Sequence, residues 1–325
     1  MEFLGTNSTF DSNFKSSKDS SIMQVMCGLF VLFLQLGLQL VEAGSIRSKN
    51  TSTVFMRGLG CLTISVVISW VCGYAFSFSP GHYLLGYDSN WFGLHKVDDA
   101  AQAHWFLHAA VSSLPSSIIA ASMSERSHLT GHLVLATVLA SVVYPLPAHW
   151  VWHHQGWLHV KGCRDVGGVI MVHLSSGVGA LVGSLLVGPR VERLGNNYRD
   201  TVVPGHSLPL VAVGGMMVLV GMVAKVVGMV EYEQIGPVAA NSLIGGAGGG
   251  VVAMSLFKLT ERRVPVSRQS LGTNKNIVMP TRGWSYLTAY NGVLAGIICI
   301  EPASLSLLIL TLTGSRSIIH SLVFS

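Results

Sequence analysis

His173 is the residue whose type and position in this sequence most directly suggest chemistry. It lies in the middle of an apolar stretch that holds no Asp, Glu, Lys or Arg between Asp165 and Arg190. At about 1.5 Å per residue, that stretch can cross the hydrocarbon core of a bilayer as one helix, with His173 roughly 12 Å from Asp165. An imidazole at this depth is costly unless it faces the protein interior or a path that contains water. His173 is therefore either a satisfied packing residue or, as we favour, the lining of a pore.

The ends and the interior of the same stretch predict a helix that packs closely against other helices. Asp165 is a suitable N-cap residue that would place a carboxylate at the positive end of the helix dipole, and Gly188 and Pro189 would end the helix. Small residues recur inside it and allow neighbouring helices to approach. They are Gly167, Gly168, Ser175, Ser176, Gly177, Gly179, Ala180 and Gly183.

The composition indicates an all-α, polytopic membrane protein. Half of the residues are hydrophobic, 11% are charged, and the 36 glycines suit close packing of transmembrane helices. The chain has no basic stripe with interleaved aromatic residues, so we expect no nucleic-acid partner. Its five cysteines form no metal-binding or disulfide pattern, and we expect neither metal nor cofactor. Its acidic and histidine residues are too scattered to form a catalytic triad or a two-carboxylate site, which argues against an enzyme.

Apolar runs predict eight membrane spans in order along the chain. They cover residues 22–44, 58–79, 104–123, 129–152, 166–187, 209–230, 238–257 and 286–303. Lys and Arg gather in the loops after the first, third, fifth and seventh spans, which predicts that these loops are cytoplasmic and that the N-terminus is extracellular. Pro115 should kink the third span, with neighbouring Ser side chains or water satisfying the freed backbone.

Three motifs in these segments stand out: Glu42-Ala43-Gly44-Ser45-x-Arg47-x-Lys49-Asn50 at the end of the first span, Pro145-x-x-Ala148-His149-x-x-Trp152 at the end of the fourth, and Asp165-x-Gly167-Gly168-x-x-x-Val172-His173 in the fifth. With these motifs the chain resembles the ammonium transporter family. The resemblance covers about residues 22–300, densely up to Arg190 and sparsely after it.

The resemblance implies a bundle of two inverted repeats of five helices each, with the pathway between them. It divides the chain into an extracellular polar segment (1–21), a first five-helix repeat (22–190), a partial second repeat (191–303) and an apolar tail (304–325). It also implies a homotrimer in the plasma membrane that takes ammonium or ammonia as its substrate. The chain would be embedded in the lipid bilayer as its other partner.

The same resemblance assigns roles to three residues. Trp152 would border an outer ammonium site, where an indole face attracts a small cation by up to about 2 kcal/mol once the site is desolvated. Asp165 would lie near this mouth, adding to the local field and holding backbone groups without touching the ion. His173 would line a narrow path, where it either accepts hydrogen bonds from the passing species or relays its proton.

Three positions depart from the family pattern. Val111 and Lys225 stand where the family stacks two phenylalanines as a hydrophobic gate, and Met229 replaces a serine that helps the outer site. Lys225 is the most consequential, because an intramembrane lysine must lose its charge, repel ammonium or snorkel toward the boundary.

The predicted spans also leave no tenth helix before Ser325, and the resemblance puts the second pore histidine on that helix. His320 has surroundings that do not match the motif. We therefore expect a truncated or divergent family member. Two functions stay open: ammonium transport, or a non-conducting protein of the transporter fold that acts as an interaction or regulatory partner.

Overall fold

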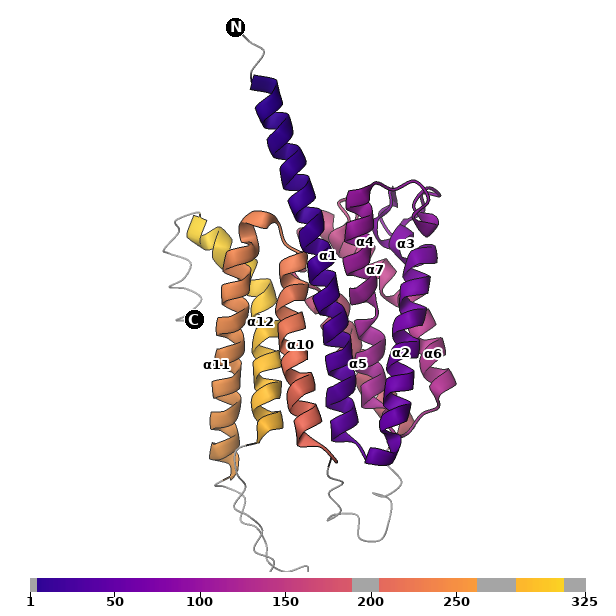
Figure 1. The fold of residues 1–325 in the computed structure, drawn as a ribbon, viewed down its shortest axis with the longest axis vertical. Coiled ribbons are helices and arrows are strands. Elements are labelled where there is room, and N and C mark those ends of the chain that lie inside the picture. Colours follow the sequence, from indigo (N-terminus) through magenta and orange to yellow (C-terminus); the bar gives the residue numbers. More distant parts are fainter. Residues whose placement is uncertain (1–4, 189–204, 262–284, 313–325) are drawn as a thin grey trace, which may run out of the picture. The chain divides into compact units, whose positions relative to one another are not determined.

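The computed structural model describes residues 5–188, 205–261 and 285–312, with side chains from 19 to 188, 205 to 260 and 285 to 301. The chain forms two compact units, Met1–Ile235 and Gly236–Ser325, which are considered one at a time. Nearly all regular structure in the described residues is helical, as the composition predicts (Figure 1). The small exception is a two-stranded antiparallel sheet of β1 (Gly81–His82) and β2 (Leu85–Gly86).

The first unit contains α1 to α10 and the start of α11. Its helices are α1 (Gly5–Ser45), η1 (Ser48–Asn50), α2 (Thr51–Ile68), η2 (Ser69–Gly73), α3 (Tyr74–Phe78), η3 (Phe92–Leu94), α4 (Asp99–Ser112), α5 (Leu114–Ser122), α6 (Leu129–Val138), η4 (Leu139–Val143), α7 (Pro145–Trp152), α8 (Trp157–Val160), η5 (Val169–Leu174), α9 (Ser175–Val187), α10 (Leu208–Gly228) and η7 (Tyr232–Gln234). The second unit consists of most of α11 (Ile235–Glu261) together with α12 (Tyr286–Leu312).

Six helical segments of the described residues are long and apolar enough to cross a membrane. They are Asp19–Ser45, Ser48–Phe78, Leu129–Val160, Val169–Val187, Leu208–Gly228 and Tyr232–Thr260. The predicted span 104–123 is not among them, because the chain breaks at Ser113 into α4 and α5. The predicted eighth span is represented by the shorter apolar segment Tyr286–Glu301.

Side chains bond the backbone at the break at Ser113, two residues after Val111, whose carbonyl loses its usual partner to Pro115. The carbonyl of Ser113 accepts hydrogen bonds from Gln35 Nε2 at 3.2 Å and from Ser116 Oγ at 2.8 Å. Gln35 Nε2 also donates to the hydroxyls of Ser113 and Ser117. A buried amide of α1 therefore stabilises the interrupted helix, which sequence reasoning had left to serines or water.

Glycines bring helices of the first unit into backbone contact. The packing of α10 against α1 is the most extensive between two helices of this unit (Figure 1). A Cβ on Gly214 of α10 would lie 2.7 Å from the carbonyl oxygen of Gly37 on α1. No larger side chain fits there, so this spacing depends on glycine.

Glycines do the same in the second unit. A Cβ on Gly249 would lie 2.3 Å from Gly292 O, and one on Gly296 would lie 2.1 Å from Gly245 O. Each helix thus presents two glycines at a spacing of four residues to the other, the arrangement that lets membrane helices approach most closely. The helix α12 continues past residue 303, where the predicted span ends, to Leu312. His320 lies outside the described residues, and the division into inverted repeats remains a prediction.

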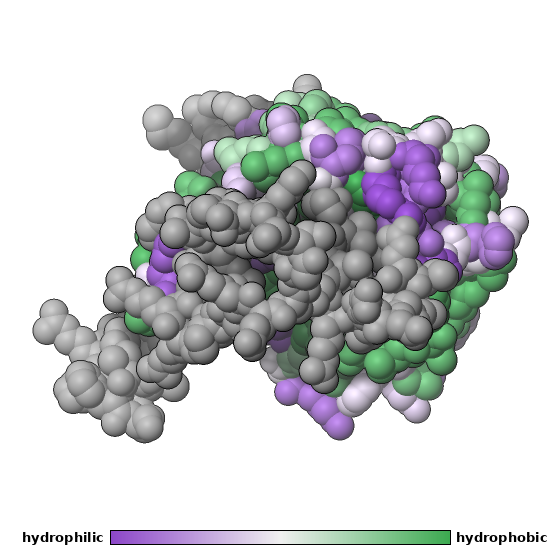
Figure 2. Space-filling view, turned by 90° about the horizontal axis from the view of Figure 1, so that it is seen from below, coloured by the Kyte–Doolittle hydropathy of each residue, from purple (hydrophilic) through white to green (hydrophobic). Residues whose placement is uncertain are grey.

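The surface fits a lipid environment along the helices. Large apolar side chains stay exposed there, including Leu185 at 72% and Leu186 at 82% on α9. Viewed from one end, a patch of hydrophilic residues lies on the part of the face that is not grey, and hydrophobic residues lie along much of the edge (Figure 2). Apolar sides with a polar end are what a membrane-spanning protein requires.

Candidate functional site

Asp165 organises the turn that carries His173. Its carboxylate accepts three backbone N–H bonds: from Val169 to Oδ1 at 2.7 Å, and from Ile170 and Met171 to Oδ2 at 3.1 and 3.2 Å. These are the otherwise unsatisfied donors at the start of a helix. Asp165 therefore caps the start of the helix, as predicted. The helix begins at Val169, however, and not directly after Asp165.

Two glycines allow this delayed cap. Gly167 and Gly168 have φ values of +82° and +84°, in the left-handed region that residues with a Cβ rarely adopt. They turn the chain so that it returns over the Asp165 carboxylate before the helix starts. His173 lies in that first stretch, η5, which is a π-helical turn. Such turns are often found at functional sites.

Trp152 is tied to the same structure. Its indole Nε1 donates to the backbone carbonyl of Asp165 at 2.8 Å. The fourth-span tryptophan and the fifth-span histidine are therefore connected through one aspartate, whose carbonyl accepts from Trp152 and whose carboxylate caps the turn of His173. The structure links Trp152 to Asp165 by a hydrogen bond and places His173 two residues after Met171, the last N–H that Asp165 caps; that all three line one pathway stays a prediction.

Trp152 belongs to an aromatic cluster formed by Tyr74, Phe78, His104, His108, Tyr144 and Trp152. The Phe78 ring is nearly parallel to the indole, with an interplanar angle of 5° and a centroid distance of 6.3 Å. The His108 ring lies 5.2 Å from the indole and 4.5 Å from Phe78. His108 is buried, and its Nδ1 is 3.2 Å from the hydroxyl of Tyr144. His108 is thus a packed residue of the cluster. The sequence alone did not single out Phe78, His104 or Tyr144 as part of the site.

Lys225 contacts His173. Its Nζ lies 2.8 Å from His173 Nε2, and the lysine side chain has no exposed surface. The possibility that Lys225 snorkels toward the membrane boundary is therefore wrong, because its amine turns into the protein and meets the imidazole. When the amine is cationic it can only donate, and in that state the ring nitrogen Nε2 accepts and the ring proton is on Nδ1.

The two other predicted site residues take no part in these hydrogen bonds. Val111 is fully buried within α4. Met229 is half-buried and forms the C-cap of α10, where its backbone N–H bonds Val226 O at 3.1 Å. Their assignment to the gate and to the outer site remains a prediction.

Electrostatics at Asp165 combine opposing effects. Burial raises the pKa of its carboxyl above the ordinary value of 3.8, while the three backbone donors and the positive charge of Lys225 favour the carboxylate. Asp165 and Lys225 therefore interact electrostatically, and the site contains an acid, a base and a cation. In the part of the chain that the structure describes, no group of three or more His, Cys, Asp or Glu residues is placed to hold a metal ion.

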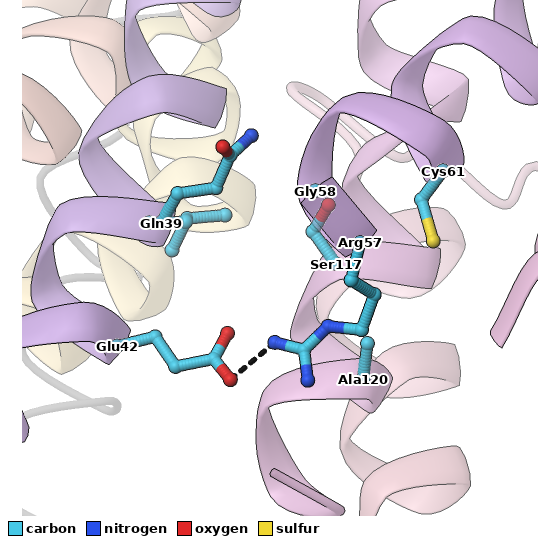
Figure 3. A pocket seen from close by; sticks show the side chains of 8 residues that line it. Gln39, Glu42, Arg57, Gly58, Cys61, Ser117 and Ala120 are labelled. Atoms are coloured by element: carbon cyan, nitrogen blue, oxygen red, sulfur yellow. Dashed lines mark hydrogen bonds and ion pairs between the residues drawn. The ribbon is translucent and has the colours of Figure 1, made fainter. Parts of the chain in front are cut away.

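A small pocket lies elsewhere in the first unit, between α1, α2 and α5 (Figure 3). Its lining residues are Leu38, Gln39, Glu42, Arg57, Gly58, Cys61, Ser117 and Ala120. Glu42 and Arg57 form a buried ion pair at its edge. None of the predicted site residues lines this pocket, which is therefore a separate feature of the helix packing.

Comparison with known proteins decides the family. The model of the Ammonium Transporter Family matches residues 22–307. The chain belongs to the ammonium transporter family. It is 25% identical to Ammonium transporter 3 of Dictyostelium discoideum over 315 residues, covering 92% of this chain and 72% of that protein. It is 26% identical to Ammonium transporter Amt2 of Archaeoglobus fulgidus over 291 residues, covering 85% of this chain and 62% of that protein.

Solved structures show the same fold. The chain resembles a protein described as Sensor Amt Protein with a TM-score of 0.75 at 22% identity, covering 89% of this chain and 69% of that one. It resembles Mep2 of Candida albicans with a TM-score of 0.73 at 22% identity, covering 88% and 60%. This member of the ammonium transporter family thus spans between 60% and 72% of the length of these four relatives.

Proposed function

We propose that this chain moves ammonium or ammonia across a membrane along a path that passes Trp152 and His173. The observation that carries the proposal is the connection of these residues through Asp165. The indole donates to the Asp165 carbonyl, and the Asp165 carboxylate caps the turn that holds His173. Capture and passage would then occur on one connected assembly. This favours a shared pathway over separate roles for Trp152 and His173.

Capture would take place at the aromatic cluster. The faces of Trp152 and Phe78 carry the negative part of the ring quadrupole, which attracts a small cation. The indole N–H is already engaged by Asp165, so the ring is held in place when the ion arrives. Binding must stay weak, because an ion that is held tightly does not leave.

Passage would depend on His173. A neutral ring nitrogen accepts a hydrogen bond from an ammonium ion and can take its proton, which lets ammonia continue through apolar surroundings. His173 is half-buried in η5, within a span that is otherwise apolar. The family model and the named relatives support ammonium as the substrate class.

One observation favours a second function. Lys225 places an amine on His173 Nε2, the atom that would receive the substrate. A chain that keeps this contact would not conduct, and would act as an interaction or regulatory partner of the transporter fold. Assembly as a homotrimer, location in the plasma membrane and an extracellular N-terminus are further parts of our proposal, based on the family resemblance and the loop charges.

Uptake of labelled methylammonium tests the capture step, in cells that lack their own ammonium uptake. Trp152→Leu removes the ring and should raise the half-saturating concentration by up to about 30-fold, corresponding to about 2 kcal/mol of cation–π attraction. Trp152→Phe keeps a ring and should retain part of the affinity. Trp70 is 47% exposed on η2, so Trp70→Leu is a matched control that should change nothing. Equal affinities for Trp152→Leu and the wild type would contradict capture at this ring.

A further inference from the structure

Lys225 reaches His173 from a helix that is held firmly in place. The residues Gly221, Lys225 and Gly228 share one face of α10, because they are spaced by four and three positions. A Cβ on Gly221 would lie 2.4 Å from Leu34 Cβ, and one on Gly228 would lie 2.7 Å from Cys27 Cβ. These contacts pack α10 closely against α1 on both sides of Lys225, so rotation of the lysine side chain can move the amine away from His173 without a shift of the helix.

The head group of Lys225 is chemically a substrate analogue. A lysine ammonium and a methylammonium ion both consist of an NH3⁺ group on a carbon, with three donors and no acceptor. At 2.8 Å from His173 Nε2, the lysine nitrogen makes the hydrogen bond that a transiting ammonium would make. The lone pair of one ring nitrogen cannot serve both at once.

We propose that Lys225 is a tethered competitor for an ammonium-binding position at His173, and that this position binds free ammonium or methylammonium when the lysine amine is removed. The inference deepens the proposed function and rests on it, since it assigns the substrate class and the regulation of the same site. Lys225 holds the position in the resting chain, and ammonium reaches His173 only while the lysine is displaced.

Binding of labelled methylammonium to the purified full chain tests the proposal. Lys225→Met removes the amine and keeps an unbranched side chain. We expect it to gain one methylammonium site per chain compared with the wild type, and the double variant Lys225→Met, His173→Ala to lose that site. Lys96→Met removes an exposed lysine that makes no hydrogen bond to His173 in the described part of the chain, and should gain no site. A Lys225→Met chain that binds no more than the wild type overturns the proposal, and so does a gained site that survives His173→Ala.

A second readout does not require a folded Lys225 variant. The wild-type chain is labelled with 15N-histidine, and the chemical shift of His173 Nε2 is followed during a methylammonium titration. The shift should stay unchanged at concentrations that saturate any site at Trp152. The resonance is assigned by its loss in His173→Ala. A shift of the Nε2 signal at those concentrations would show that free cation reaches the ring without competition and would overturn the proposal.

Uptake measurements separate this inference from the proposed function. Wild-type uptake that is lost in His173→Ala and at least tenfold higher in Lys225→Met supports both. Uptake that depends on His173 but is equal in the wild type and Lys225→Met overturns the competitor and leaves transport standing. A His173-dependent binding site in Lys225→Met, with no uptake by any variant, supports the competitor and removes transport.

Discussion

Replacing Asp165 by Asn should loosen the turn that carries His173 far more than an ordinary cap substitution would. The carboxylate accepts three N–H bonds: Oδ1 accepts from Val169, and Oδ2 accepts from Ile170 and Met171. An amide side chain keeps one oxygen, which can accept from Ile170 and Met171, and turns its NH2 group toward Val169. The Val169 N–H then faces another donor.

The magnitude follows from the lost bond to Val169 and from the loss of charge in the other two bonds. Each hydrogen bond to a charged group contributes about 1.5–3 kcal/mol, and burying a neutral side chain in place of a charged one recovers part of the loss. We expect a net cost of about 2 kcal/mol for the turn, which corresponds to roughly 30-fold faster amide exchange at these positions. Hydrogen exchange of the peptide that covers residues 166–174 in the purified chain measures it directly.

Asp98 supplies the matched control. It is exposed and caps α4 through a single bond, from Ala101 N–H to Oδ1 at 2.9 Å. Asn caps as well as Asp when only one donor is involved, so Asp98→Asn should leave exchange at the start of α4 nearly unchanged. If Asp165→Asn exchanged no faster than the wild type in residues 166–174, the carboxylate would not be what holds the turn of His173.

Two further predictions concern stability. Gly296→Ala should lower the unfolding free energy by about 1–3 kcal/mol, because its Cβ would lie 2.1 Å from the backbone oxygen of Gly245. A Cβ on Gly248 would meet nothing within 4 Å, so Gly248→Ala should be neutral or stabilising, and denaturant unfolding of both variants checks this. Removing one member of the buried Glu42–Arg57 pair should lower the unfolding free energy by about 3–5 kcal/mol. The double variant Glu42→Gln, Arg57→Met should lose less than the sum of the two single variants, and additive losses would argue against an interaction between the two side chains.

Much of the fold could be predicted because its signals are local. Long apolar runs and the restriction of charge to loops predict membrane helices without knowledge of their packing. The third span shows the limit of such reasoning. Pro115 indicated a kink, but the interruption at Ser113 and its stabilisation by Gln35 depend on a side chain distant in sequence.

The sequence identified candidate residues of the site, but it did not predict how they are arranged in space. Asp165 was expected to cap the fifth helix, yet the positive φ values of Gly167 and Gly168 delay the helix start, and no local pattern distinguishes that turn from a simple cap. The snorkelling option for Lys225 failed for a related reason. The direction of a long side chain depends on which groups surround it in three dimensions, and His173 lies 52 positions away in sequence.

Uptake of labelled methylammonium by the full chain tests the central claim most directly, in cells without their own ammonium uptake and after the protein is shown to reach the membrane. Wild type, His173→Ala and Lys225→Met are compared at equal amounts in the membrane. The account predicts saturable uptake that is abolished in His173→Ala and increased in Lys225→Met. No uptake by either the wild type or Lys225→Met, from protein that is correctly inserted, would contradict transport by this chain.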